Sequence, residues 1–224
     1  MATVSWTSAS KETFEDAKTN GKALVLYFED KSKDAKWAED VDLADLQKKA
    51  LVSCVVVSAP KDGDAKTGVS PAGAVPQNRL AAADLWLAYG SPAAGTFIVC
   101  DEYGNEFARS TEKKLEKTVT SLRKLVREAR ASVKESVQKA QKLVDAKDDG
   151  AAVQELLKAF KLNLTGWDEA TSAAKLYNDI MGRAREQLAA AGDDEAKLKQ
   201  LQKTFAGTDV SAEIDKALTK LAEK

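Results

Sequence analysis

The chain has 224 residues, of which 44% are hydrophobic and 31% charged, so it can bury a core in one large domain or two modest ones. Its formal net charge of −1 argues against a protein built around a polyanion, and no nucleic-acid partner is expected. Histidine is absent and there are only two cysteines, which removes the commonest general base near neutral pH and the usual zinc ligands. We therefore predict no catalytic residue, no metal and no cofactor.

The composition changes near residue 110, and this change divides the chain into two halves. All four prolines, both cysteines and every strand-like run precede it, whereas the sequence after it is rich in Ala, Leu, Lys, Glu and Gln. We predict an α/β domain over 1–111 followed by an all-helical domain over 112–224.

In the first half, helices and strands are expected to alternate. The continuous apolar runs at 23–28 and 51–57 are typical of strands covered on both faces. Ser10 is suited to cap a helix that Gly21 ends. The expected elements, in chain order, are a helix over 11–20, a strand over 22–28, a helix over 34–50, a strand over 51–57, a long loop over 59–78, a helix over 79–89 and a hairpin with strands 96–101 and 105–109.

The second half is expected to begin with a long helix over 112–147, because apolar residues recur there at spacings of three and four. This apolar stripe consists of Leu115, Val119, Leu122, Val126, Ala129, Val133, Val137, Ala140 and Val144. Eleven basic and five acidic side chains share the helix. We interpret them as a solvated face, since no aromatic residue accompanies them as in nucleic-acid sites. Four further helices are expected near 151–162, 168–191, 193–205 and 209–223.

The sequence carries no signal for membrane insertion or export. No apolar stretch approaches the roughly 18 residues of a membrane span. The first ten residues lack the basic and apolar regions of a signal peptide. We expect a cytoplasmic protein if Met1 is the native start, and a periplasmic or secreted one if a signal peptide has been removed.

The order of the predicted elements resembles thioredoxin, and local sequences in the first half strengthen the likeness. Trp6 and the stretch 17–28, with its Ala-Lys and Gly-Lys pairs before an apolar strand, look like the start of bacterial thioredoxin-like domains. The stretch 87–106 resembles the family's helix end, its Pro-Thr-Phe strand and its final hairpin. The resemblance covers about half of the chain and implies a thioredoxin-like fold.

The departures from the family concern its redox chemistry. Five residues stand where the CxxC motif and the basic residue after it belong: Ser32, Lys33, Asp34, Ala35 and Lys36. A serine hydroxyl cannot form the mixed disulfide that thiol–disulfide exchange requires. Gly95 replaces the family's cis-proline before Thr96. We therefore predict a redox-inactive domain.

The two remaining cysteines are not expected to replace the lost pair. In the thioredoxin order the strand over 22–28 lies between the strands that hold Cys54 and Cys100. Two strand spacings would separate the cysteines by ~9–10 Å, beyond the reach of a disulfide. We interpret both as buried apolar residues.

The altered active-site loop is the candidate binding site, and two interpretations of it stay open. Lys33 and Lys36 could form a peptide- or anion-binding spot beside a helix start, or Ser32 simply caps that helix and the lysines are solvated. Gly95, next to Thr96, either lets an extended peptide approach the backbone or reflects relaxation after the redox function was lost. The long loop over 59–78 is either a recognition loop or an insertion.

The helical half resembles degenerate tetratricopeptide-type hairpins, although it lacks their 34-residue consensus. Together the two halves indicate a non-catalytic protein-binding or scaffold protein with a protein or peptide partner. The alternative is a chaperone-like or redox-accessory factor that binds unfolded or oxidised chains, by analogy with chaperones of the endoplasmic reticulum. A glutathione-dependent transferase is disfavoured, because Gly95 stands where its cis-proline would be.

Overall fold

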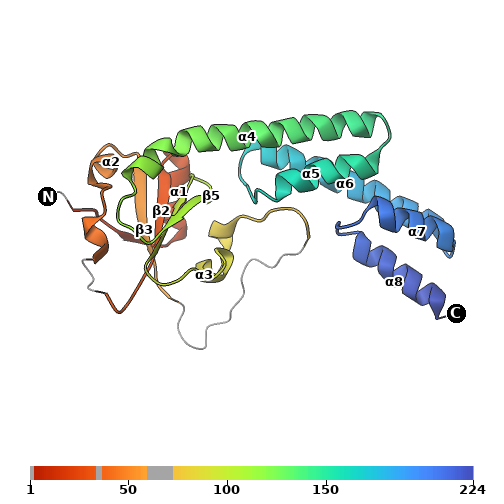
Figure 1. The fold of residues 1–224 in the computed structure, drawn as a ribbon, viewed down its shortest axis with the longest axis horizontal. Coiled ribbons are helices and arrows are strands. Elements are labelled where there is room, and N and C mark those ends of the chain that lie inside the picture. The colour runs from red at the N-terminus through yellow and green to blue at the C-terminus, as the bar shows by residue number, and fades with distance from the viewer. Residues whose placement is uncertain (1–2, 34–36, 60–72, 224) are drawn as a thin grey trace. The chain divides into compact units, whose positions relative to one another are not determined.

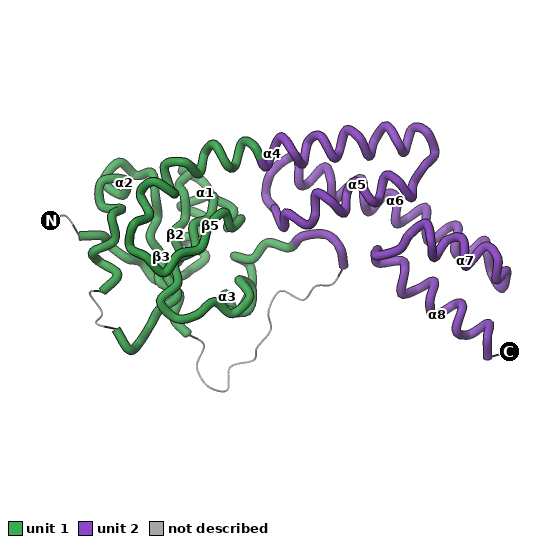
Figure 2. The backbone as a smooth tube through the Cα atoms, viewed as in Figure 1, with its two compact units in different colours: residues 1–70, 77–128 green, residues 71–76, 129–224 purple. Residues whose placement is uncertain are grey.

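The computed structural model describes residues 3–33, 37–59 and 73–223 (Figure 1). The chain forms two compact units, one of residues 1–70 and 77–128 and the other of residues 71–76 and 129–224 (Figure 2). The composition change placed the boundary after residue 111, whereas the units divide after residue 128, inside helix α4 (Glu116–Asp145). The reason is the apolar stripe of this helix, whose Val119 and Leu122 are buried in the core of the first unit.

The first unit is an α/β structure. Its elements in chain order are β1 (Thr7–Ser8), α1 (Lys11–Thr19), β2 (Ala23–Phe28), the 3-10 helix η1 (Trp37–Asp40), α2 (Ala44–Lys48), β3 (Val52–Val57), the 3-10 helix η2 (Arg79–Ala81), α3 (Leu85–Ala88), β4 (Thr96–Cys100), β5 (Glu106–Ser110) and the first half of α4. Four of the strands and α1 match the predicted elements. Strand β1 has only two residues, too few for an apolar pattern to reveal it.

The five strands form one mixed sheet in the order β1-β3-β2-β4-β5. Strand β2 runs parallel to β3 and antiparallel to β4, and β5 is antiparallel to β4. The predicted position of β2, between the strands that carry Cys54 and Cys100, is confirmed. Both faces of β2 are covered, as its continuous apolar run predicts: Leu24, Val25, Leu26 and Phe28 have no exposed surface.

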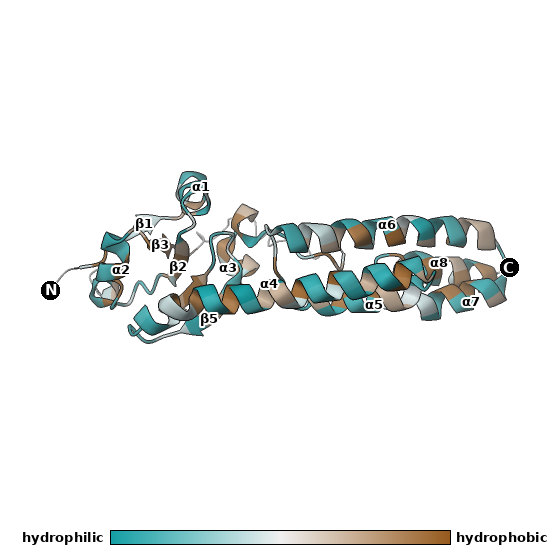
Figure 3. Ribbon diagram, turned by 90° about the horizontal axis from the view of Figure 1, so that it is seen from above, coloured by the Kyte–Doolittle hydropathy of each residue, from teal (hydrophilic) through white to brown (hydrophobic). Residues whose placement is uncertain are grey.

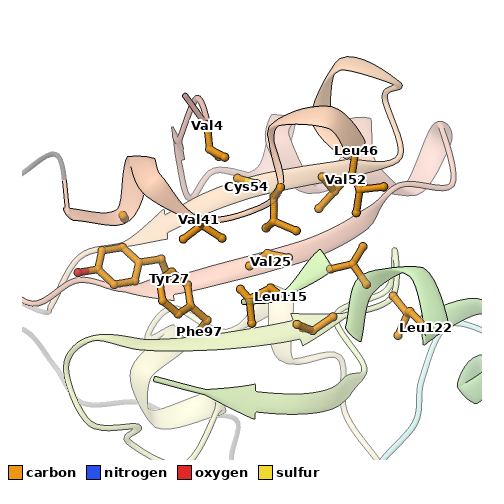
Figure 4. Close-up of a cluster of buried hydrophobic side chains, with 14 residues drawn as sticks. Val4, Val25, Tyr27, Val41, Leu46, Val52, Cys54, Phe97, Leu115 and Leu122 are labelled. Atoms are coloured by element: carbon orange, nitrogen blue, oxygen red, sulfur yellow. The ribbon is translucent and has the colours of Figure 1, made fainter. Parts of the chain in front are cut away.

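Each face of the sheet holds a separate cluster of buried side chains. On one face, Val25, Tyr27 and Phe97 pack against Leu115 and Leu122 at the start of the long helix (Figure 4). The cluster on the other face includes the following residues: Ala17, Leu24, Leu26, Phe28, Val55, Val57, Tyr89, Ile98 and Cys100. The sheet therefore has two cores, and the apolar stripe of α4 completes one of them.

The predicted helix over 34–50 is wrong for its described part, which contains η1 and the short α2. Asp42 lies between these two helices and belongs to neither. Its carboxylate accepts hydrogen bonds from the backbone N–H groups of Leu115 (2.5 Å) and Glu116 (3.0 Å), which explains the interruption. It thus satisfies donors at the start of α4 that have no partner within the helix. Residues 34–36 lie outside the described residues.

The predicted helix over 79–89 is also interrupted. Asn78 caps η2 by accepting from the backbone N–H of Leu80, and Asp84 caps α3 by accepting from that of Leu87. Ala82 between them is extended. Two capping side chains so close together start two short helices in place of one. Of the long loop over 59–78, residues 60–72 lie outside the described residues.

The turn between β4 and β5 is built around the Asp101 carboxyl group. Its Oδ1 accepts hydrogen bonds from the backbone N–H groups of Tyr103 (3.0 Å) and Asn105 (2.9 Å), and its Oδ2 accepts from Asn105 Nδ2 (2.8 Å). The side chain is buried. Burial raises the pKa of Asp101 to about 6, because desolvation of the charged form outweighs these hydrogen bonds.

This buried acid predicts a pH dependence of stability. Between about pH 4 and pH 6 the native state holds the Asp101 proton more tightly than the unfolded state does, so the free energy of unfolding falls as the pH rises through that window. A pKa shift of about two units limits this change in the free energy of unfolding to about 3 kcal/mol. Urea titrations across the window, on the wild type and on Asp101→Asn, measure the difference. Parallel pH profiles in the two proteins would contradict the assignment.

The second unit is helical. After the second half of α4 its elements are α5 (Asp149–Phe160), α6 (Asp168–Ala191), α7 (Glu195–Thr204) and α8 (Ser211–Ala222), which confirms the five predicted helical stretches. Hydrophobic and hydrophilic residues are interspersed along both α4 and α6, as expected for amphipathic helices (Figure 3). The side chains of this unit that have no exposed surface include Val153, Leu156, Tyr177, Ile180, Phe205, Val210 and Ile214.

Residues 73–76 belong to the helical unit because Asp209 holds them there. The backbone N–H of Ala74 donates to Asp209 Oδ1 at 2.8 Å. Gly73, with φ +114°, approaches so closely that a Cβ on it would lie 2.8 Å from the same oxygen. The backbone N–H of Asp209 donates to the hydroxyl of buried Tyr177 at 3.1 Å. The unit is thus assembled from two separate parts of the chain.

Candidate functional site

The loop that stands in the place of the CxxC motif of thioredoxin follows β2 in the chain. The helix start that Ser32 was expected to cap falls outside the described residues, and Ser32 itself lies in the described part of the loop. Its Oγ donates to Asp30 Oδ1 at 2.6 Å, and its backbone N–H donates to the same oxygen at 3.0 Å. These hydrogen bonds, with the nearby Lys33 ammonium group, lower the pKa of Asp30. Asp34, Ala35 and Lys36 lie outside the described residues.

Lys33 is held by three neighbours. Its Nζ lies 3.7 Å from Asp30 Oδ2 and 3.7 Å from the centroid of the Trp37 ring. The same atom lies 3.0 Å from the place that a Cβ on Gly95 would occupy. Lys33 and Gly95, which belong to distant parts of the chain, therefore meet, and the lysine covers the glycine backbone.

The backbone beside Gly95 is already engaged. The N–H of Gly95 donates to the Phe28 carbonyl at 2.7 Å, and the N–H of Thr96 donates to the Ala93 carbonyl at 3.2 Å. The Thr96 hydroxyl donates to that carbonyl too, at 2.6 Å. Gly95 has φ +87°, a conformation that favours glycine, and no peptide bond in the described residues is cis. An extended peptide would find neither N–H group available here.

Trp37 links this loop to the aromatic part of the core. Its ring stacks on Phe97 with centroids 5.6 Å apart, and lies 5.7 Å from the ring of Tyr27. Lys113 Nζ approaches the Trp37 ring as well, 4.7 Å from its centroid, and pairs with Asp40 at 3.5 Å. Two ammonium groups therefore contact one indole, which positions the loop electrostatically as well as by packing.

The two cysteines lie away from this loop and are unsuited to thiolate chemistry. Both are buried and free, and they belong to the clusters on opposite faces of the sheet. Burial raises the pKa of Cys54 to about 12 and raises that of Cys100 further. A reactive cysteine needs the opposite, a lowered pKa and access to solvent.

A hollow of about 450 Å³ lies where β5 ends, close to Thr96. Two segments line it, one with Pro92, Ala93 and Thr96 and the other with Arg109, Ser110, Thr111 and Glu112. The Arg109 guanidinium group is fixed at its side, since it donates to the Glu106 carboxylate and to the Tyr89 carbonyl. The pairing with Glu106 also raises the pKa of Arg109.

Strand β5 is an edge of the sheet, and among the described residues no strand pairs with its outer side. The pairing with β4 is irregular between Val99 and Cys100, where a bulge interrupts the register. From Ala108 to Ser110 the register is regular, and this stretch runs into the hollow. The outer backbone groups of Ala108 to Ser110 therefore lead into a hollow that has room for a side chain.

Sequence reasoning brought Lys33 and Gly95 into one site but missed the groups that hold them. Asp30 and Trp37 are near Lys33 in the sequence, and an acid and an aromatic residue flanking a lysine were the available signal. The hollow at β5 had no such signal, because it depends on the register of the hairpin and on a bulge.

Other kinds of site find no support in the described part of the chain. There, no group of three or more Cys, Asp and Glu side chains is placed to hold a metal ion. None of the described helices is both long and apolar enough to cross a bilayer. Comparison of the chain with protein families, with curated proteins and with solved structures finds no match.

Proposed function

We propose that the protein is a non-catalytic protein-binding or scaffold protein, and that it holds an extended polypeptide segment along the edge of β5. The observation that carries the proposal is the regular stretch Ala108 to Ser110, which leads directly into the hollow beside Thr96. An added strand would gain main-chain hydrogen bonds from the edge, and one of its side chains would enter the hollow.

The proposal includes a thioredoxin-like N-terminal domain without redox cysteines. The central position of β2, with β3 parallel on one side and β4 antiparallel on the other, supports that assignment. The helical unit is proposed to consist of hairpins of the tetratricopeptide type. Successive helices from α5 to α8 contact one another, which such hairpins require.

The edge of β5 is favoured over the loop at Lys33 as the binding surface. At Gly95 and Thr96 the N–H donors are already used within the chain, and Lys33 covers the glycine. At the edge, by contrast, no strand of the described residues pairs with the outer side of β5. The burial and raised pKa of both cysteines support a binding role over thiol chemistry.

Selection of peptides from a random displayed library on the immobilised protein tests the proposal. Selected peptides should bind with micromolar dissociation constants and shift the amide resonances of residues 106–112. Thr111→Trp fills the hollow from an exposed position and should weaken binding at least about tenfold, which corresponds to the loss of about 1.4 kcal/mol. Thr120→Trp, the same change on the exposed face of α4, should leave peptide binding unchanged.

Three results bear on the alternatives. Peptide-induced shifts confined to the helical unit or to residues 30–33 would contradict binding at β5. Capture of many unrelated unfolded chains without one enriched sequence would favour the chaperone-like function. Reduction of insulin disulfides by the purified protein would contradict the non-catalytic proposal.

A further inference from the structure

A second hollow lies in the α/β unit, between the start of α4 and the turns that precede β2 and β3. Its volume is about 350 Å³, within the range of small-molecule sites. The apolar part of its lining consists of Ala23, Leu46, Leu51, Val119, Leu122 and Val126. It shares no lining residue with the hollow at β5, so this inference is independent of the proposed function.

Leu51 is the unusual member of this lining. It is 39% exposed, and among the described residues of the α/β unit it is the large hydrophobic side chain that remains exposed. The residue before it, Ala50, has φ +54°, a left-handed conformation that residues with a Cβ rarely adopt. The turn from α2 to β3 therefore keeps an apolar side chain at the mouth of the hollow in a backbone conformation that is itself unfavourable.

Basic residues are concentrated at the start of α4 and just before it, whereas the charged lining of the hollow consists of Asp101, Glu102 and Arg123. Arg123 lines the hollow, is exposed, and forms no ion pair within the described residues. Over residues 113–128 there are two acidic residues, Glu116 and Glu128, and six basic ones: Lys113, Lys114, Lys117, Arg123, Lys124 and Arg127. Of these, Lys113 pairs with Asp40 and Lys124 with Glu128. On the opposite wall, the carboxylate of Asp101 accepts hydrogen bonds from Tyr103 and Asn105 of the hairpin turn. Glu102 is the remaining acid of the lining.

From this combination we infer that the hollow binds an anionic amphiphile, with its apolar chain against Leu51, Val119 and Val126 and its carboxylate at Arg123. The apolar walls supply most of the binding energy, and the single guanidinium group sets the orientation by a charge-assisted hydrogen bond. Thr120, exposed on α4 between these groups, stands at the mouth.

The size of the hollow limits the length of the chain. A cavity of roughly 150 Å³ accommodates one benzene ring, and this hollow is more than twice that size. An apolar body of about ten carbons is therefore the largest that the space can enclose. Decanoate is the probe that fits, and decylammonium is its match in chain length with the opposite charge.

Calorimetric titration of the full-length protein with decanoate, below its micelle-forming concentration, tests the inference. One molecule is expected to bind per chain, more tightly than decylammonium. Arg123→Gln should weaken decanoate at least about tenfold, whereas Lys117→Gln, an equal charge change at an exposed site outside the lining, should not. Thr120→Trp should abolish binding, and Thr111→Trp should leave it intact.

The inference is overturned if decanoate fails to bind at millimolar concentration, if decylammonium binds more tightly, or if Arg123→Gln and Lys117→Gln weaken binding equally. Unchanged binding in Thr120→Trp would also overturn it. Both tryptophan variants change exposed side chains, and circular dichroism confirms their folding. Since Thr111→Trp and Thr120→Trp serve as reciprocal controls for the two hollows, failure at one site is distinguished from failure at the other.

Discussion

Replacing Phe97 with alanine is expected to lower the free energy of unfolding by about 3–5 kcal/mol, the usual cost of deleting a fully buried aromatic ring. Phe97 has no exposed surface. Its ring stacks on Tyr27 (5.0 Å between centroids) and on Trp37 (5.6 Å), and Trp6 lies 6.0 Å away. The alanine variant loses three aromatic neighbours at once and leaves a cavity between them.

Urea denaturation followed by tryptophan fluorescence measures this cost, with Phe97→Leu as the control. Leucine keeps most of the buried volume, so its cost should be clearly smaller than that of alanine. The near-ultraviolet circular dichroism of the alanine variant should weaken as Trp37 loses its stacking partner. A cost below about 1 kcal/mol for alanine would show that the aromatic cluster does not form the core of this unit.

Gly104→Ala is expected to destabilise the protein by about 2–4 kcal/mol, from a left-handed backbone and from overpacking together. Gly104 has φ +78° in the hairpin turn, and a Cβ there would overlap the side chain of Leu80. Its carbonyl accepts a hydrogen bond from the Tyr89 hydroxyl at 2.8 Å, so the turn cannot simply move away.

Gly21→Ala provides the matched control for this variant. Gly21 also has a left-handed φ, +58°, but nothing lies within 4 Å of the place that its Cβ would take. Its cost should be limited to the backbone part, about 1–2 kcal/mol. Equal costs in the two variants would show that contact with Leu80 contributes nothing. Denaturant titrations of both proteins under one condition give the comparison.

The elements that sequence predicted well are those whose pattern is local. In β2, β3 and α4 the spacing of the apolar residues within the element itself indicates which side chains are buried. The interrupted helix over 34–50 shows the opposite case. Its sequence is compatible with a helix, but Asp42 is needed at the start of α4, more than seventy residues away. A long-range cap thus overrode a local preference.

The same distinction applies to the candidate sites. The resemblance to a known family directed attention to Ser32, Lys33 and Gly95, and the structure gathers Lys33 and Gly95 into one place. The two hollows have no counterpart in any motif. One depends on the register of β4 and β5, and the other on the left-handed turn at Ala50. Both arise from tertiary structure, which periodicity and spacing do not describe.

The hydrogen bond between Ala74 and Asp209 affects the order in which the chain can fold during synthesis. The two residues are 135 positions apart, so Ala74 leaves the ribosome long before its acceptor is made. At usual translation rates the wait is on the order of ten seconds. Meanwhile the α/β unit can fold around its sheet, with residues 73–76 still uncommitted. The helical unit can be completed only after Asp209 and α8 have emerged.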